Sequence, residues 1–314
     1  MRDAKLRIRS REATRVFVSV IVPVWNEVEK LHKCLRSLET QTYPSDLYEV
    51  IVVDNSSTEK IEPVISYYPH ARLMQEQKAG SYAARNAGLA HAQGEIIAFT
   101  DADCFPASNW LESGVTHLLR SEGCAVVAGR IEMFPRLPLR PNAVEQYELL
   151  ISMAQKEFVR KYKFGATANL FTFKQVFERA GPFLGDVKSG GDLEWGRRVV
   201  EAGYVLEYSD EVRVFHAARF SLAQLYSKII RITGGLHDLK RLKGRRYLEF
   251  DRSLLLDLAP PVRAVMRILL ASSLQPKTER LKVCGVIFFV RYVQVFERFR
   301  LAFPRLWNHH TTTR

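Results

Sequence analysis

The sequence predicts an α/β protein with a mainly parallel sheet covered by helices on both faces, followed by a basic, mainly helical C-terminal extension. From residue 16 onward, short β-branched runs alternate with helix-like segments. The runs are apolar almost throughout, which is typical of parallel strands buried on both faces. Strand signals fade after about residue 218. A chain of 314 residues is long enough for one large domain with such an extension.

The strands and helices of this sheet can be placed by composition. Strand-like segments lie at 16–24, 48–54, 71–76 and 95–101, and helix-like segments lie between them at 26–41, 59–68 and 81–92. Ligands of doubly wound sheets bind beyond the carboxyl ends of the strands. The first strand ends at Pro23 and continues into "VWNE", the second ends at Asp54, and the fourth ends at Asp101. We expect these three ends to line one crevice.

Two aspartates, Asp101 and Asp103, stand one residue apart directly after the fourth strand, in "AFTDADCF". A desolvated carboxylate is costly unless a cation or a hydrogen-bond donor compensates it. On an extended chain the two side chains project to the same side, so together they could hold a Mg²⁺-like ion that carries a diphosphate. Taken alone, the pattern also fits a turn in which an aspartate caps the next helix.

Charge divides the chain at about residue 218. Residues 1–218 hold 27 Lys/Arg and 28 Asp/Glu, whereas residues 219–314 hold 19 and 6. Residues 1–15 are interpreted as a basic N-terminal tail, 16–218 as the α/β domain, and 219–314 as the basic extension. The excess favours a polyanionic partner for the extension, either an anionic membrane face or nucleic acid. Nucleic acid is the weaker interpretation, because no recognised nucleic-acid motif accompanies the charge.

Cysteine spacing and hydropathy indicate the redox environment of the protein and its relation to the membrane. The four cysteines form no CxxC pair and no zinc-type cluster, which favours a reducing, cytoplasmic environment. The longest apolar run, "VCGVIFFV", has eight residues, too few for a spanning helix, which needs about 20. The segment around it, 285–303, mixes large apolar residues with arginine. It therefore fits either a helix lying on the inner face of the membrane or a helix packed on the catalytic domain.

Several ordered motifs over about two thirds of the chain resemble family 2 glycosyltransferases. They are "VSVIVPVWNE", "VIVVDNSS", "GSYAARNAGLAHAQGEIIAFTDAD" and "GGDLEWGRRV". The resemblance implies a GT-A nucleotide-sugar-binding fold, related to the Rossmann fold. It also implies inverting transfer of a sugar from a nucleoside diphosphate sugar to a glycan or lipid-linked acceptor, with Mn²⁺ or Mg²⁺, in envelope or exopolysaccharide synthesis.

The resemblance also assigns roles to residues of this chain. Asp54 would hydrogen-bond the nucleobase and Glu27 would lie beside the nucleoside. Asp103, assisted by Asp101, would hold the metal on the diphosphate. Asp192 would be the general base that deprotonates the acceptor hydroxyl. On the residue pattern alone, Asp192 could equally be an N-cap of the helix that follows.

Five further residues are candidates, each with an ordinary structural alternative. Arg85 could balance the aspartates or contact phosphate, or it could be a surface charge. Glu194 could orient acceptor or base, and Trp195 could stack on a sugar, although a solvated acid and a packing residue fit equally. His216 lies where the family often has a histidine near the metal, or it could be a packing or capping residue, and Asn169 could reach the acceptor. Many relatives read Glu-Asp where this chain reads Gly191-Asp192, which leaves the acceptor preference open.

Two other classes of function remain open at this point. A sugar nucleotidyltransferase also uses an α/β nucleotide fold and metal-binding aspartates, but it would be expected to show a Gly-rich phosphate loop where this chain reads "PVWNE". A catalytically silent nucleotide-sugar-binding protein would use the basic extension as its working part. Release of nucleoside diphosphate from a nucleotide sugar would separate transfer from both alternatives.

Overall fold

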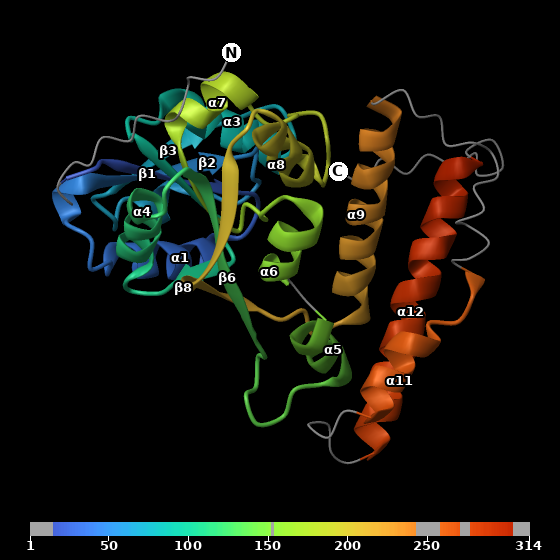
Figure 1. Cartoon of the computed structure of the whole chain (residues 1–314). Helices are drawn as coiled ribbons and strands as arrows, with labels where there is room; N and C mark the ends of the chain where they lie inside the picture. The colour runs from blue at the N-terminus through green and yellow to red at the C-terminus, as the bar shows by residue number, and fades with distance from the viewer. Residues whose placement is uncertain (1–14, 152–153, 243–257, 271–276, 304–314) are drawn as a thin grey trace. The chain divides into compact units, whose positions relative to one another are not determined.

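The structure is a computed structural model that describes residues 15–151, 154–242, 258–270 and 277–303 (Figure 1). Residues 1–14 of the predicted basic tail lie outside this range. The chain forms two compact units. The first unit comprises residues 1–132, 153–186 and 191–216, and the second comprises 133–152, 187–190 and 217–314. Segments 133–152 and 187–190 fall inside the range that the sequence assigns to the catalytic domain.

The first unit is built on an eight-stranded sheet with the order β3-β2-β1-β4-β7-β6-β8-β5. Its first four strands run parallel to one another and lie where the sequence predicts them: β1 (Val18–Val24), β2 (Tyr48–Asp54), β3 (Ala71–Gln75) and β4 (Ile96–Thr100). All residues of β1 and β4 are buried, so helices must cover both faces. The predicted α/β class is confirmed.

The sheet continues past β4 with antiparallel strands. The remaining strands are β5 (Cys104–Pro106), β6 (Cys124–Phe134), β7 (Asn169–Phe173) and β8 (Val205–Ala217). Strand β7 pairs antiparallel with β4 and with β6, and β5 pairs antiparallel with β8. In this register Thr100 is opposite Asn169 and Cys104 is opposite His216. The pairing brings together residues that are 69 and 112 positions apart in the sequence, beside the two aspartates.

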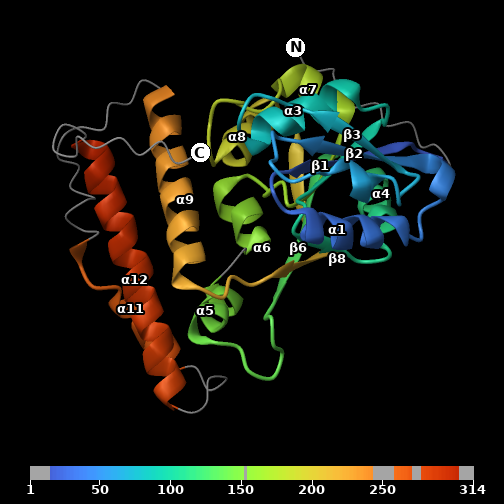
Figure 2. The same ribbon diagram turned by 180° about the vertical axis from the view of Figure 1, so that it is seen from behind.

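Helices cover the sheet from both sides, with α3 and α7 on one side and α1 and α4 on the other in both views (Figure 1, Figure 2). The helices of this unit are α1 (Val28–Glu39), α2 (Glu62–Ile65), α3 (Ser81–His91), α4 (Trp110–Arg120), α6 (Gln155–Glu157), α7 (Lys174–Ala180) and α8 (Gly191–Glu201), with a 3-10 turn η1 (Ser45–Leu47) and a π-helical turn η2 (Phe158–Tyr162). Close packing on the sheet requires small residues. A Cβ at Gly88 of α3 would lie 2.7 Å from the Ile21 side chain of β1.

The second unit is helical in its described residues, as the sequence predicts for the extension. It contains α5 (Ala143–Ile151), α9 (Leu222–Leu242), α11 (Val262–Leu270) and α12 (Lys277–Ala302). Two apolar clusters bind these helices together, one around Ile268 and Val283 and one around Leu225 and Val286. Among the described residues, no helix has both the length and the apolar composition required to cross a bilayer.

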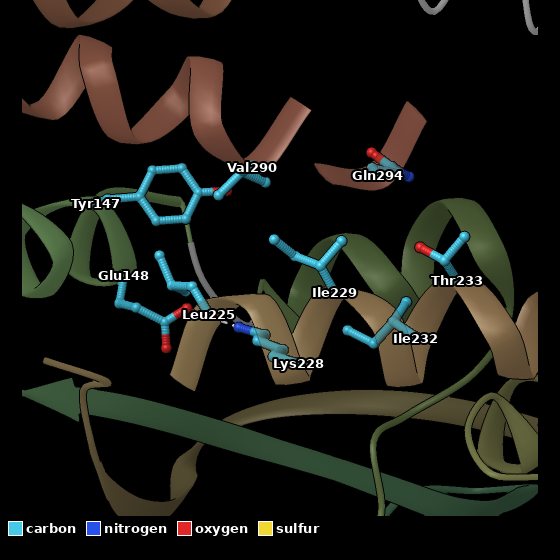
Figure 3. A pocket seen from close by; sticks show the side chains of 9 residues that line it. All are labelled: Tyr147, Glu148, Leu225, Lys228, Ile229, Ile232, Thr233, Val290 and Gln294. Carbon is cyan, nitrogen blue, oxygen red and sulfur yellow. Dashed lines mark hydrogen bonds and ion pairs between the residues drawn. The ribbon is translucent and has the colours of Figure 1, made fainter. Parts of the chain in front are cut away.

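A buried ion cluster lies beside a pocket in this helical unit. Glu148 is 1% exposed, and its two carboxylate oxygens accept hydrogen bonds from Lys228 Nζ at 2.7 Å and Arg219 Nη1 at 2.9 Å. The pocket has a volume of about 170 Å³ and lies among α5, α9 and α12. Figure 3 shows Glu148 and Lys228 at one end of it and Thr233 and Gln294 at the other.

Candidate functional site

The loops that follow β1 and β2 are joined by the side chain of Asn26. Its backbone has φ 51°, a left-handed conformation that asparagine tolerates better than most residues. Its Oδ1 accepts hydrogen bonds from the backbone N–H groups of Thr58 at 2.7 Å and Glu59 at 3.3 Å. Asp54, at the end of β2, is 7% exposed and accepts the Ser57 N–H at 2.9 Å. The two loops thus form one wall at the carboxyl ends of the strands, next to the buried Pro23 of β1.

Asp101 is paired with a buried arginine from α3. Arg85 is 3% exposed, and its Nη2 donates a short hydrogen bond to Asp101 Oδ1. The guanidinium also lies 5.4 Å from the centre of the Tyr82 ring. Its Nε is buried and has no hydrogen-bond partner among the described residues. Arg85 is therefore a charge inside the site and not a surface charge of the helix.

Asp103 lies against His216, which the β5–β8 pairing brings beside Cys104. The distance from His216 Nε2 to Asp103 Oδ2 is 3.3 Å, and His216 is 4% exposed. Potential ligand atoms of Asp103, Cys104 and His216 all lie within 4.8 Å of one another. Burial, reinforced by Asp103 and Asp101, raises the pKa of the Cys104 thiol well above its usual value, which disfavours the thiolate that would bind a metal ion. A carboxylate oxygen and an imidazole nitrogen remain, a donor pair that suits Mn²⁺ or a similar divalent ion.

The pKa of Glu27 is affected by the negatively charged aspartates at these strand ends. Glu27 lies at the start of α1, and its pKa is raised, first by burial and then by the charge of Asp103, with a smaller contribution from Asp101. A hydrogen bond from Lys30 Nζ at 2.6 Å opposes the shift. Three carboxylates therefore face one region in which Arg85 is a buried cation, and this arrangement favours binding of a further cation.

Asp192 lies in the first turn of α8, at the same side of the sheet as α3. The hydroxyl of Tyr82 donates to its Oδ1 at 3.1 Å, and the Leu193 N–H donates to the same oxygen at 2.9 Å. The helix begins at Gly191, so Asp192 is already inside it and does not bond the N–H groups that an N-cap would satisfy. Burial raises the pKa of Asp192, while the two donors and the charge of Arg85 oppose the shift.

The candidates Glu194 and Trp195 are directed into the interior. Glu194 is 8% exposed, and both of its carboxylate oxygens accept hydrogen bonds from Arg198 Nε, at 3.0 and 2.9 Å. Trp195 is 1% exposed, its Nε1 donates to the Gly181 carbonyl at 3.1 Å, and its ring stacks on Phe177 at 4.7 Å. These contacts are those of packing residues. Neither side chain offers a free surface to a sugar.

Asn169 is also fully buried, at the start of β7. Its Oδ1 accepts a hydrogen bond from Trp110 Nε1 at 2.8 Å, and its Nδ2 donates to the carbonyls of Arg130 and Val212, each at 2.9 Å. All three polar positions of the amide are therefore occupied by groups from α4, β6 and β8. These hydrogen bonds connect the strands of the antiparallel half of the sheet. They leave no N–H of the Asn169 amide available for an acceptor substrate.

Tyr82 belongs to the site and was not predicted from the sequence. The signal that could have found it is its spacing: Tyr82 and Arg85 are three residues apart in a helix and so lie on one face. The partner, Asp192, is 110 positions away in sequence. Only the packing of α3 beside α8 brings the two together.

A second group of potential metal ligands, His117, Cys124 and Glu207, lies elsewhere on the sheet. His117 Nε2 is already 2.8 Å from Glu207 Oε2, and burial raises the pKa of the Cys124 thiol to about 12. His117 and Glu207 are thus already paired with each other, and burial of Cys124 disfavours its thiolate.

The fold is that of the GT-A class of glycosyltransferases. The structure resembles a mannosyltransferase, PcManGT from Pyrobaculum calidifontis, solved in complex with GDP-Man and Mn²⁺ (TM-score 0.61, 22% identity, 95% of this chain and 89% of that one). It also resembles S. aureus TarS 1–349 in complex with UDP (TM-score 0.53, 17% identity, 94% of this chain and 93% of that one).

The chain belongs to glycosyl transferase family 2. The family's sequence profile matches residues 19–180, and the resemblance seen in the motifs is thereby confirmed. Among characterised sequences, the chain is 39% identical to the glycosyltransferase AglE from Haloferax volcanii over 228 residues, which covers 71% of this chain and 74% of AglE. The protein is therefore an enzyme of glycosyl transfer.

Proposed function

We propose that the protein is an inverting glycosyltransferase that moves a sugar from a nucleoside diphosphate sugar to a hydroxyl of a glycan or lipid-linked acceptor. The observation that carries this proposal is that helix α3 links two separate groups of acids. Arg85 of α3 bonds Asp101, and Tyr82, one turn earlier, bonds Asp192. A donor-binding acid pair and a separate base are the minimum set that such a transfer requires.

On the donor side, we assign the nucleobase to Asp54 and the nucleoside to the neighbourhood of Glu27 and Pro23. Arg85 offers a positive charge toward the diphosphate, supported by its burial and by its Nε, which has no partner within the described part of the chain. Asp103 and His216, with Asp101 assisting, would hold Mn²⁺ or Mg²⁺. A bound divalent ion would stabilise the charge that the leaving diphosphate gains as the glycosidic bond breaks. The acids around Glu27 and the Mn²⁺ in the PcManGT structure support this assignment.

On the acceptor side, Asp192 takes the proton of the attacking hydroxyl. The hydroxyl oxygen forms the new bond to the anomeric carbon while the bond from that carbon to the diphosphate oxygen breaks. Attack opposite to the leaving group inverts the configuration. Because a carboxylate accepts the proton only when ionised, the donors on Oδ1 keep Asp192 usable despite the burial that raises its pKa.

We further propose that the extension contacts the inner face of a membrane and that the product belongs to envelope or exopolysaccharide synthesis. In α12 the apolar residues Val283, Val286 and Ile287 are buried among the neighbouring helices. Helix α11 is different: Val262, Met266 and Leu270 are 60%, 48% and 75% exposed. Their spacing of four residues places them on one helix face, and Arg263 and Arg267 are exposed on the same helix. An apolar face with neighbouring arginines fits an anionic lipid surface.

The experiment that tests the catalytic proposal is Asp192→Asn. The amide has nearly the same size but accepts no proton, so we expect kcat to fall by about 10²- to 10⁴-fold with donor KM nearly unchanged. Release of nucleoside diphosphate from a donor panel, with Mn²⁺ or Mg²⁺, measures the rate. Asp210→Asn, an exposed acid of β8, is the matched control and should keep wild-type activity. Near wild-type turnover by folded Asp192→Asn would refute the assignment.

A further inference from the structure

The two oxygens of the Asp192 carboxylate are in different environments. Oδ1 accepts both described hydrogen bonds, from the Tyr82 hydroxyl and the Leu193 N–H. Within the described part of the chain, Oδ2 accepts none. The arrangement fixes the rotation of the carboxylate and leaves one oxygen for a ligand proton. Tyr82 can hold this position because it is itself 5% exposed and packed 5.7 Å from the Phe183 ring.

The residue before the base is glycine because of the same tyrosine. A Cβ at Gly191 would lie 2.9 Å from three carbons of the Tyr82 ring, closer than real Cβ contacts. The Tyr82 ring therefore occupies the space that a side chain at position 191 would need. Any side chain at position 191 would therefore have to displace the Tyr82 ring from its place beside Asp192.

We infer that Tyr82 is a positioning residue for Asp192, and that Tyr82 and Gly191 form a matched pair in which the absence of a side chain at position 191 leaves room for the ring. The inference rests on the proposed role of Asp192. In the transfer, the acceptor proton moves to Oδ2, while the Tyr82 hydroxyl keeps its hydrogen bond to Oδ1 before and after the step. Burial and the Asp192 charge raise the pKa of the Tyr82 phenol, so it remains a donor and does not act as a base itself.

Tyr82→Phe tests the positioning role, because it removes the hydroxyl and keeps the ring against Gly191. A donor to a carboxylate lowers its pKa, so loss of the donor raises the pKa of Asp192. The ionised form is the active one, and we therefore expect the ascending limb of the kcat–pH profile to move to higher pH. Loss of a hydrogen bond to a charged group corresponds to a shift of the limb by about one pH unit. At pH values below the limb, kcat of Tyr82→Phe should therefore be about tenfold lower than that of the wild type.

The matched control is Tyr48→Phe. Tyr48 is 4% exposed, and its hydroxyl donates to the Leu38 carbonyl at 3.0 Å, away from the site. Both variants lose one buried hydrogen bond, but only Tyr82→Phe should move the limb. A profile that does not move in Tyr82→Phe overturns the inference. If Asp192→Asn also keeps full activity, the proposed base has failed; if Asp192→Asn is inactive, only the positioning role has failed.

The pairing has a separate test in the variants Gly191→Ala, Tyr82→Leu and the double variant. The new Cβ at position 191 displaces the ring, so Gly191→Ala should move the pH limb in the same direction as Tyr82→Phe. In the double variant the ring is absent, and the added methyl group should cost little beyond Tyr82→Leu alone. Effects on kcat that simply multiply would overturn the pairing.

Discussion

Asn169→Ala provides a test of whether this residue supports the sheet or contacts the acceptor. The substitution deletes three hydrogen bonds, with lengths of 2.8, 2.9 and 2.9 Å. It leaves the Trp110 indole N–H and the Val212 carbonyl without their partner in the interior, where both residues are 0% exposed. Each orphaned buried group costs about 1–3 kcal/mol. With two such groups, we therefore expect the free energy of unfolding to fall by about 2–6 kcal/mol.

Thermal unfolding followed by circular dichroism measures this loss. At about 2–4 °C per kcal/mol for a unit of this size, the midpoint should fall by roughly 10 °C. Thr172→Val is the matched control on the same strand, since it removes a buried hydroxyl that donates to the Ala125 carbonyl at 3.0 Å, and it should cost about 1 kcal/mol. Donor KM and kcat of the folded Asn169→Ala protein should stay near wild type. An unchanged midpoint together with a raised acceptor KM would refute the structural role.

The other predictions concern the metal and the membrane. Asp103→Ala should abolish Mn²⁺-dependent donor binding in calorimetry without unfolding the protein, because it removes an oxygen ligand and no core side chain. Asp186→Ala, at an exposed aspartate, is the control. Unchanged donor affinity in Asp103→Ala would contradict the metal assignment. Met266→Ser combined with Leu270→Ser should weaken binding to anionic vesicles at least several-fold, whereas Leu139→Ser, at a residue 96% exposed in the same unit, should not. Equal vesicle binding by the wild-type protein, the double variant and Leu139→Ser would refute the membrane proposal.

The parallel half of the sheet could be predicted from sequence because its signals are local. Strand β2 was predicted to the residue, since "YEVIVVD" is an apolar run that is interrupted only by Glu49 and ends in an acid. Beyond β4 this logic fails: β7 and β8 pair with strands far away in sequence, and local composition does not fix such partners. The placement of His216 beside Asp103 follows from the β5–β8 register, so the structure and not the strand pattern gives the reason for it.

Side-chain direction was the least predictable part of the site. Trp195 and Glu194 belong to the motif that contains Asp192, and all three lie in a helix that turns each successive residue by about 100°. Glu194 therefore lies on the side of the helix opposite Asp192. Trp195 lies on a part of the helix next to Asp192, and only the packing shows that Asp192 meets Tyr82 of α3 while Trp195 stacks on Phe177. Tyr82 was missed for the complementary reason, because its neighbours in sequence give no indication of a partner on another helix.

The carboxylate of Glu148 couples three positions of the chain in a way that bears on its evolution. One buried acid compensates two cations, Arg219 and Lys228, and burial alone would lower the pKa of Lys228. A neutral residue at 148 would leave the positive charges of Arg219 and Lys228 without their partner, and a neutral residue at 219 or 228 would leave Glu148 with one cation in place of two. Homologues should therefore change these three sites together, and covariation among positions 148, 219 and 228 would mark this helical unit in sequences whose surfaces have otherwise diverged.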